Sequence, residues 1–84
     1  MSDEKLFNTK IGKKFKELRT SVGLDQKHIS TILNIPRSAV SLIESGERGL
    51  SVYEFDLLCR VLRSPPNDML GWSRTKAAEV KIWN

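Results

Sequence analysis

Cysteine and histidine are scarce in this sequence, and their scarcity excludes several kinds of site. Each occurs once among 84 residues, so Cys59 has no second thiol for an internal disulfide or a shared metal ion. Cys59 falls in an apolar helical pattern, and we interpret it as a small buried core residue rather than a redox sensor. His28 falls on the polar face of a short predicted helix, where we expect a solvated side chain rather than a ligand or a base.

Other marks of enzymes and metalloproteins are missing as well. The sequence has no Cys–His pair, no Gly-rich phosphate loop and no group of residues with metal-ligand spacing. Its Asp and Glu residues occur singly or where they can cap helices. We therefore expect no enzymatic activity, no metal and no cofactor.

Long apolar runs are also absent. No stretch approaches the roughly 18 apolar residues that a membrane-spanning helix needs. The first residues, "MSDEKLF", carry acids where a secretory signal needs a basic start and an apolar segment. We therefore expect a cytoplasmic protein without a membrane segment, and the length fits one domain with a small core.

Positive charge is what the sequence has in excess. The net charge is +4 and the isoelectric point is near 9.5. Six basic residues fall within the first nineteen: Lys5, Lys10, Lys13, Lys14, Lys16 and Arg19. Such a cluster indicates an anionic partner, usually nucleic acid. A solvated lysine face explains the charge equally well when charge is considered alone.

Apolar spacing predicts a first helix over about residues 7–20. Five apolar residues recur at steps of three and four and should share the core face: Phe7, Ile11, Phe15, Leu18 and Val22. Gly23 is a typical end for such a helix.

Two short helices should follow in close succession. Asp25 is a good N-cap for "QKHISTIL", and Asn34 tolerates the left-handed conformation that a tight turn requires. Pro36 suits the start of the next helix, which Gly46 ends. The residues expected to face inward are Ile29, Ile32, Leu33, Val40 and Ile43.

Two further helices complete the predicted domain. Ser51 and Glu54 fit a capping box, in which each side chain satisfies a free backbone N–H of the other residue. The core residues of this helix should be Phe55, Leu58, Cys59 and Leu62. "SPPNDML" predicts a short fifth helix that ends at Gly71, with Met69 and Leu70 inward. Residues 72–84 fit either an amphipathic helix or a strand alternating at Val80 and Ile82, so we predict a domain over 1–71 and a C-terminal extension over 72–84.

The second and third helices match a helix-turn-helix in outline, since each has about eight residues and the turn has three or four. In that motif the first helix lies across the sugar-phosphate backbone. The second helix projects from the surface because only a protruding helix fits the major groove, which is about 12 Å wide.

The stretch "LDQKHISTILNIPRSAVSLIESGERGLSVYEFDLLCRVL" resembles the Cro/C1-type (XRE-like) helix-turn-helix domain of phage repressors and their bacterial relatives. The resemblance extends over about residues 7–71 and includes the "DMLG" after the fourth helix. It implies an all-α, compact, five-helix lambda-repressor-like fold. It also implies a transcriptional regulator, usually a repressor, that binds double-stranded DNA as a homodimer on a near-palindromic operator.

The resemblance assigns roles to individual positions. Three positions correspond to residues that read bases: Arg37, Ser38 and Leu42. Gln26 corresponds to a residue whose side chain and backbone N–H hold a phosphate. Arg19 and Glu44 correspond to an internal ion pair.

Four positions depart from the family pattern. Asn34 replaces a turn glycine, Pro36 replaces a Ser or Thr cap, and Ser64 replaces an apolar residue, which suggests a looser junction before the fifth helix. Leu42 stands where Arg, Lys or Gln is usual, so the operator sequence does not follow from the resemblance.

The side chains themselves support several of these contacts. The Arg37 guanidinium can donate two hydrogen bonds to O6 and N7 of a guanine, worth roughly 1–3 kcal/mol of discrimination, although contact with a phosphate alone is the alternative. An exposed Leu42 can pack on a thymine methyl, the alternative being a protein contact. Ser41 lies nearer the edge and suits a base or a phosphate. Further candidates for phosphate contact, or for a purely solvated role, are Arg48, Lys10 and Lys13.

A second apolar stripe is predicted on the fourth helix. Tyr53, Leu57 and Val61 are spaced by four residues on the side opposite the core, and a small monomer seldom leaves such a patch in water. We expect a homodimer interface there. The alternative is that the C-terminal segment covers the stripe with Trp72, Val80, Ile82 and Trp83.

Other functions remain open at this point. The chain could be an antitoxin, the DNA-binding end of a longer regulator, or a protein-interaction module that kept the fold and lost affinity for DNA. The basic first helix and Arg37 favour DNA binding over the last of these.

Overall fold

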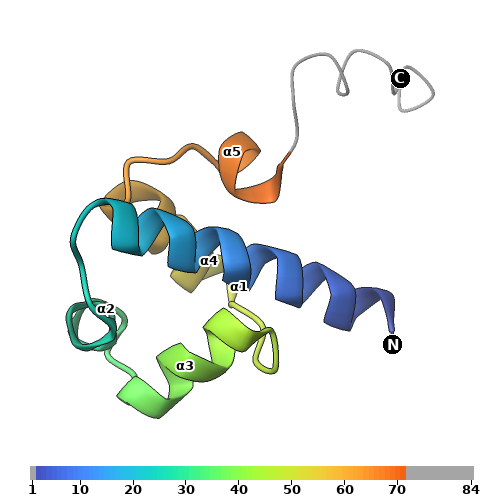
Figure 1. The fold of residues 1–84 in the computed structure, drawn as a ribbon, viewed down its shortest axis with the longest axis horizontal. Helices are drawn as coiled ribbons and strands as arrows, with labels where there is room; N and C mark the ends of the chain where they lie inside the picture. Colours follow the sequence, from blue (N-terminus) through green and yellow to red (C-terminus); the bar gives the residue numbers. More distant parts are fainter. Residues whose placement is uncertain (1, 72–84) are drawn as a thin grey trace.

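The computed structural model describes residues 2–71, and this part of the chain forms five α-helices without a β-strand (Figure 1). Their bounds are α1 Asp3–Ser21, α2 Gln26–Leu33, α3 Arg37–Ser45, α4 Val52–Val61 and α5 Pro66–Leu70. The prediction of an all-α, five-helix fold is confirmed. The predicted helix or strand of the extension lies outside the described residues. None of the described helices is both long and apolar enough to cross a membrane.

Helix α1 occupies the middle of the molecule (Figure 1). It packs against α3 on one side and against α5 on the other. Its N-terminal turns extend past the ends of the other helices. The α2–α3 pair is therefore held on one side of α1, and this side carries the candidate site described below.

The start of α1 is four residues earlier than the apolar spacing predicted. The Ser2 hydroxyl caps the helix by accepting a hydrogen bond of 3.1 Å from the Lys5 backbone N–H. Asp3 and Glu4 lie in the first turn, where negative charge is favourable. Phe7 consequently lies on the extending part of α1 and is 52% exposed.

Val22 also differs from prediction. It is the C-cap of α1 and is 53% exposed, because the helix has ended and the chain is turning away at this residue. The prediction that Phe7 and Val22 share the core face is wrong, whereas Ile11 and Phe15 are buried as predicted.

The core is built from all five helices. Its buried members are Phe15, Ile29, Leu33, Val40, Ile43, Leu58, Cys59, Leu62 and Met69. Burial raises the pKa of the Cys59 thiol, as expected for a packed side chain. Ser64 is buried too, and within the described residues its hydroxyl finds no hydrogen-bond partner.

The second stripe of α4 is not opposite the core as predicted. Leu57 is half-buried and packs against the core cluster, and Val61 is half-buried as well. The buried side of α4 includes Glu54. The buried side is therefore rotated toward Leu57 relative to the predicted core face, and Phe55 on that predicted face is only half-buried. Tyr53 alone among the three stripe residues is strongly exposed, at 70%.

Direct backbone packing fixes α3 against α1. Gly12 is buried in the middle of α1, and a β-carbon there would overlap the carbonyl oxygens of Ile43 and Glu44. Gly46, the left-handed C-cap of α3, is also close to Thr9, whose Cα would lie 2.5 Å from an added β-carbon. Sequence reasoning missed the contact at Gly12, because a glycine inside an apolar helical pattern carries no local signal for it.

Candidate nucleic-acid interface

The turn between α2 and α3 has the geometry that the sequence predicted. Asn34 adopts the left-handed conformation with φ of 56°. The Ser30 hydroxyl donates a 2.6 Å hydrogen bond to the carbonyl of Ile35, which ties the turn to α2. Asp25 caps α2 in a capping box with His28, whose side chain is 60% exposed. The backbone N–H group of His28 lowers the pKa of Asp25.

The outward side of α3 carries the predicted base-reading residues. Arg37, Ser38, Ser41 and Leu42 are all exposed, whereas Val40 and Ile43 on the opposite side are buried. Leu42 is 42% exposed although it is apolar. The four predicted base-reading side chains thus form one accessible face of α3, on a helix that projects from the domain.

Arg19 and Glu44 form the expected ion pair. Arg19 Nε lies 2.6 Å from Glu44 Oε2, and Arg19 Nη2 donates a 3.2 Å hydrogen bond to Glu44 Oε1. Arg19 Nη1 also donates to the carbonyl oxygen of Leu24 at 2.8 Å. The two side chains are only 9% and 5% exposed. The ion pair therefore connects the end of α1 to the C-terminal end of α3. The hydrogen bond to Leu24 connects both to the residues just before α2.

Gln26 extends this network toward the start of α3. Its side-chain Nε2 donates a 2.9 Å hydrogen bond to Glu44 Oε1, and its Oε1 accepts a 3.4 Å hydrogen bond from Arg37 Nε. As the first residue of α2, Gln26 also presents a backbone N–H that no helical carbonyl accepts. That N–H suits an anion, so the backbone of Gln26 is as good a candidate for the predicted phosphate contact as its side chain.

Arg48 is engaged within the protein. Its Nη1 and Nη2 donate to the two carboxylate oxygens of Glu54 at 3.1 and 3.0 Å, and Nη1 also donates to the carbonyl of Gly49. The hydrogen bonds from Arg48 hold the pKa of the Glu54 carboxyl below its usual value. Sequence reasoning identified Glu54 only as a cap for α4, because its pairing with Arg48 depends on how the loop folds. The side chain of Arg48 is still 34% exposed.

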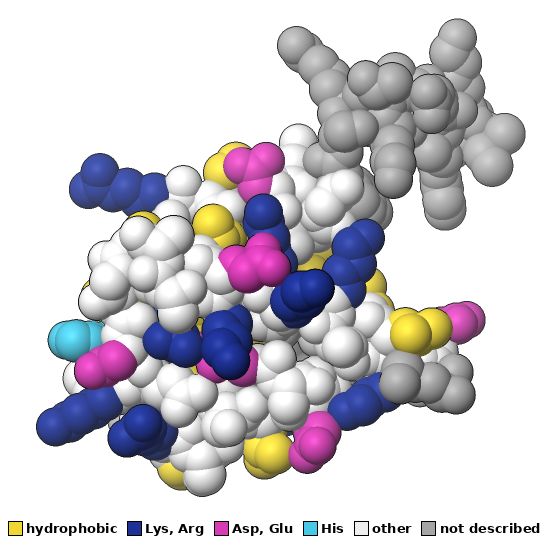
Figure 2. Space-filling view, viewed as in Figure 1, with side chains coloured by type: hydrophobic (Ala, Val, Ile, Leu, Met, Phe, Trp, Pro, Cys, Tyr) yellow, Lys and Arg dark blue, Asp and Glu magenta, His cyan; other side chains and the backbone are white. Residues whose placement is uncertain are grey.

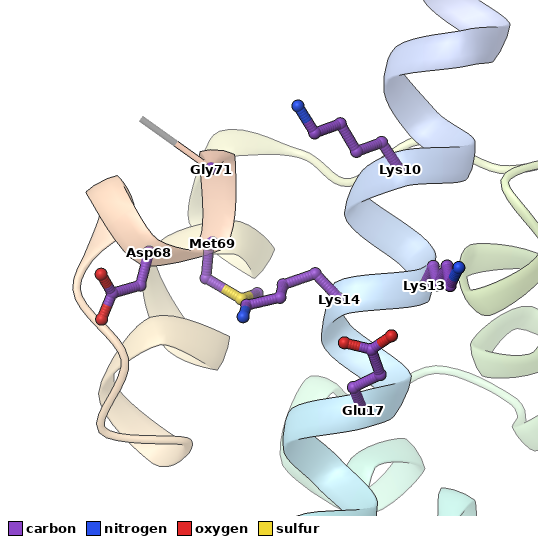
Figure 3. A pocket seen from close by; sticks show the side chains of 7 residues that line it. All are labelled: Lys10, Lys13, Lys14, Glu17, Asp68, Met69 and Gly71. Carbon is purple, nitrogen blue, oxygen red and sulfur yellow. The ribbon is translucent and has the colours of Figure 1, made fainter. Parts of the chain in front are cut away.

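The two lysine candidates lie near a groove between α1 and α5, and of the two only Lys10 points toward α5. The groove of about 270 Å³ between these helices is lined by Lys10, Lys13, Lys14, Glu17, Asp68, Met69 and Gly71 (Figure 3). Lys10 and Lys14 point toward α5, and Lys13 points away from it. Since α3 packs on another side of α1, the structure does not bring Lys10 together with Arg37.

Surface charge by itself marks no single patch on the visible face of the molecule. Figure 2 shows Lys and Arg side chains spread over this face, with Asp and Glu side chains between them. In residues 2–71, no three His, Cys, Asp or Glu side chains lie close enough to hold a metal ion together.

Comparison with known proteins gives a family match, matches to solved structures and one negative result. A family profile described as helix-turn-helix matches residues 15–69. A matching solved structure is the restriction-modification controller protein C.AhdI from Aeromonas hydrophila. It shares 31% sequence identity, with a TM-score of 0.66 over 74% of this chain and 94% of that chain. Comparison with curated proteins gave no match.

Proposed function

Because the chain belongs to the helix-turn-helix family, of the Cro/C1 type that its sequence resembles, we propose that it is a sequence-specific transcriptional regulator that reads the major groove with α3. The observation that carries this proposal is the outward face of α3, where Arg37, Ser38, Ser41 and Leu42 are exposed together. A helix that presents its N-terminal residues in this way can place them against base edges.

Each side chain suits a different contact. Arg37 can donate two hydrogen bonds to a guanine, and Leu42 can pack on a thymine methyl group. Ser38 and Ser41 can each donate or accept one hydrogen bond. The best phosphate contact is Gln26 at the start of α2, because backbone N–H groups and a helix N-terminus both attract an anion. Arg48, Lys10 and Lys13 are secondary candidates, since Arg48 is paired with Glu54 and Lys10 points toward α5.

The regulator is proposed to act as a homodimer on a near-palindromic operator. Tyr53 and its neighbour Val52, 70% and 88% exposed, give the start of α4 an apolar surface that a second copy can cover. Leu57 and Val61 would form the half-buried edge of this interface. A two-fold dimer presents two recognition helices to two half-sites, so protein symmetry and operator symmetry correspond.

The regulatory role is proposed to be repression. The similar protein C.AhdI is a restriction-modification controller protein, and a controlling role is one that this chain can share. The proposed role is DNA binding in the cytoplasm, without catalysis or a cofactor.

The test is selection of bound duplexes from a random DNA pool at about 150 mM salt, where non-specific phosphate contacts are weakened. We expect an enriched near-palindrome whose half-site spacing is close to one helical turn of DNA. A single unrepeated site would contradict the dimer alone. Failure to enrich any duplex would contradict DNA reading and would favour a protein-interaction role, including an antitoxin.

A further inference from the structure

Glu44 lies at the far end of α3 from Arg37, yet the two side chains are connected through Gln26. We propose that Glu44 is a positioning residue for DNA specificity. Its carboxylate fixes the orientation of the Gln26 amide, and the Gln26 carbonyl then holds Arg37 for base reading. This inference rests on the proposed function, because it concerns how Arg37 meets a base pair.

The orientation of the Gln26 amide follows from the groups on either side of it. A carboxylate can only accept hydrogen bonds, so the group that faces Glu44 Oε1 at 2.9 Å must be the NH₂ of Gln26. The carbonyl oxygen then points away from Glu44 and toward Arg37 Nε, 3.4 Å away. A flipped amide would place oxygen against oxygen at Glu44 and donors against donors at Arg37.

This arrangement leaves the reading atoms of Arg37 available. A guanidinium has five N–H donors, and the contact with Gln26 uses only the one on Nε. Both terminal nitrogens stay accessible for O6 and N7 of a guanine. The bond to Gln26 is long, so it guides the exposed arginine rather than immobilising it. Even so, it reduces the side-chain freedom that Arg37 must lose on binding DNA.

Glu44 is well suited to anchor such a chain of contacts because it cannot move freely. Its side chain is 5% exposed and accepts hydrogen bonds from Nε and Nη2 of Arg19. The orientation of an exposed arginine is therefore set from inside the domain. In this arrangement the buried ion pair has a second role beside holding α1 to α3.

The experiment compares binding to the selected site with binding to the same duplex changed at the base pair read by Arg37. The ratio of the two dissociation constants is the discrimination. We expect Glu44→Gln and Gln26→Met to lower the discrimination by on the order of 3- to 10-fold. Glu44→Gln replaces an acceptor-only carboxylate by an amide that no longer fixes the orientation of Gln26, and Gln26→Met removes the hydrogen bond to Arg37. Gln26→Met leaves the ion pair in place and carries the test if Glu44→Gln does not fold.

Two matched variants separate positioning from stability and from charge. Arg19→Lys weakens the ion pair but keeps the Glu44 carboxylate, so it should destabilise the fold and retain the discrimination. Lys27→Met, at the exposed neighbour of Gln26, should weaken binding to both duplexes equally. An equal fall in discrimination for Arg19→Lys and Glu44→Gln would overturn the proposal, because a purely structural role predicts it.

The contact between Gln26 and Arg37 can also be measured without DNA. Exchange of the Arg37 Nε–H with water, followed by NMR, should be slower in the wild-type protein than in Gln26→Met and Glu44→Gln. Unchanged exchange, or unchanged discrimination in folded Gln26→Met, would overturn this inference alone. If Arg37→Ala itself left the discrimination unchanged, base reading by Arg37 would be wrong, and the positioning role would be wrong with it.

Discussion

Helix α1 packs more closely on the side that faces α3 than on the side that faces α5. Toward α3, helix backbones touch at Gly12 and Gly46, and the polar side chains of Arg19, Glu44 and Gln26 are joined in one network. Toward α5, the partner is a five-residue helix, the shared surface contains an open groove with three lysines, and the nearby Ser64 hydroxyl is unpaired within the described residues. The difference indicates that the fold specifies the position of α3 more strictly than the position of α5.

Loss of the ion pair should have the largest effect. Arg19→Met leaves the Glu44 carboxylate buried without its cation, which typically costs about 3–5 kcal/mol of unfolding free energy. Urea denaturation followed by circular dichroism measures it. Lys16→Met, on the exposed side of the same helix, is the control and should change stability by less than about 0.5 kcal/mol. Similar stabilities for the two variants would show that the α3 side is not the stricter one.

Gly12→Ala should come next. The added methyl group would overlap the backbone carbonyls at the end of α3, and overpacking of this kind costs roughly 1–3 kcal/mol. Alanine is the better helix former by about 1 kcal/mol, so any measured loss understates the steric cost. Lys13→Ala, one residue further along and exposed, is the matched control in the same denaturation experiment. A stabilised Gly12→Ala variant would mean that α3 can move away from α1 at little cost.

The two sides should also differ in DNA binding. Arg37→Ala should remove roughly 1–3 kcal/mol of discrimination at one base pair of each half-site and leave the fold intact. Lys10→Ala, on the groove side, should leave the preferred site unchanged and lower the affinity only slightly and equally for all duplexes, as expected for a secondary phosphate candidate. Repeating the duplex selection with each variant tests this. The assignment of base reading to the α3 side would be wrong if the preferred site survived Arg37→Ala. The secondary role of the groove side would be wrong if Lys10→Ala strongly reduced the affinity for every duplex.

The loop after α3 should give the domain part of its pH dependence. The folded-state pKa of Glu54 is lowered from its ordinary value of 4.5, chiefly by the hydrogen bonds from Arg48. The pair therefore stabilises the fold fully above that value, and the contribution is lost as the pH falls through the lower folded pKa. Glu54→Gln should cost about 1–2 kcal/mol at neutral pH.

The same variant should also show a shallower loss of stability below about pH 4.5 than the wild type. Urea titrations at several pH values measure both effects. Asp25, whose pKa is lowered as well, also loses its contribution at low pH, so the informative quantity is the difference between variant and wild type. Parallel pH profiles would contradict the assignment to Glu54.

The smallest change is expected at Ser64, and its sign is opposite. Ser64→Ala removes a buried hydroxyl without a partner in the described part of the chain, so we expect a gain of about 1 kcal/mol. For a domain of this size, such a gain raises the melting temperature by roughly 4–8 °C. Ser45→Ala, an exposed serine with a local hydrogen bond, is the control. A destabilised Ser64→Ala variant would show that the hydroxyl has a partner in solution.

The sequence predicted best what local chemistry determines. The caps at Asp25 and Ser51, the left-handed turn at Asn34 and the inward faces of α2 and α3 each depend on residues close together in the chain. Apolar spacing could not locate the start of α1, because the cap at Ser2 lies five residues before Phe7, the first residue of the apolar series.

What could not be predicted depends on segments distant in sequence. The close approach at Gly12, the pairing of Arg48 with Glu54 and the burial of Leu57 all require knowing how helices and loops pack. In the candidate site, the Arg19–Glu44 pair was expected only from the family resemblance. The link from Glu44 through Gln26 to Arg37 was not expected, because it joins the two ends of α3 through a residue of α2.

Because α1 and α3 make a backbone contact, the residues that hold α3 in place are different from the residues that α3 exposes. Since α3 is held through Gly12, Gly46 and side chains that face inward, the four outward residues contribute little to keeping the helix in place. Their identities can change without a new scaffold. A domain of this kind can thus acquire a different proposed DNA target by exchanging a few surface side chains, provided that the glycine at position 12 is kept.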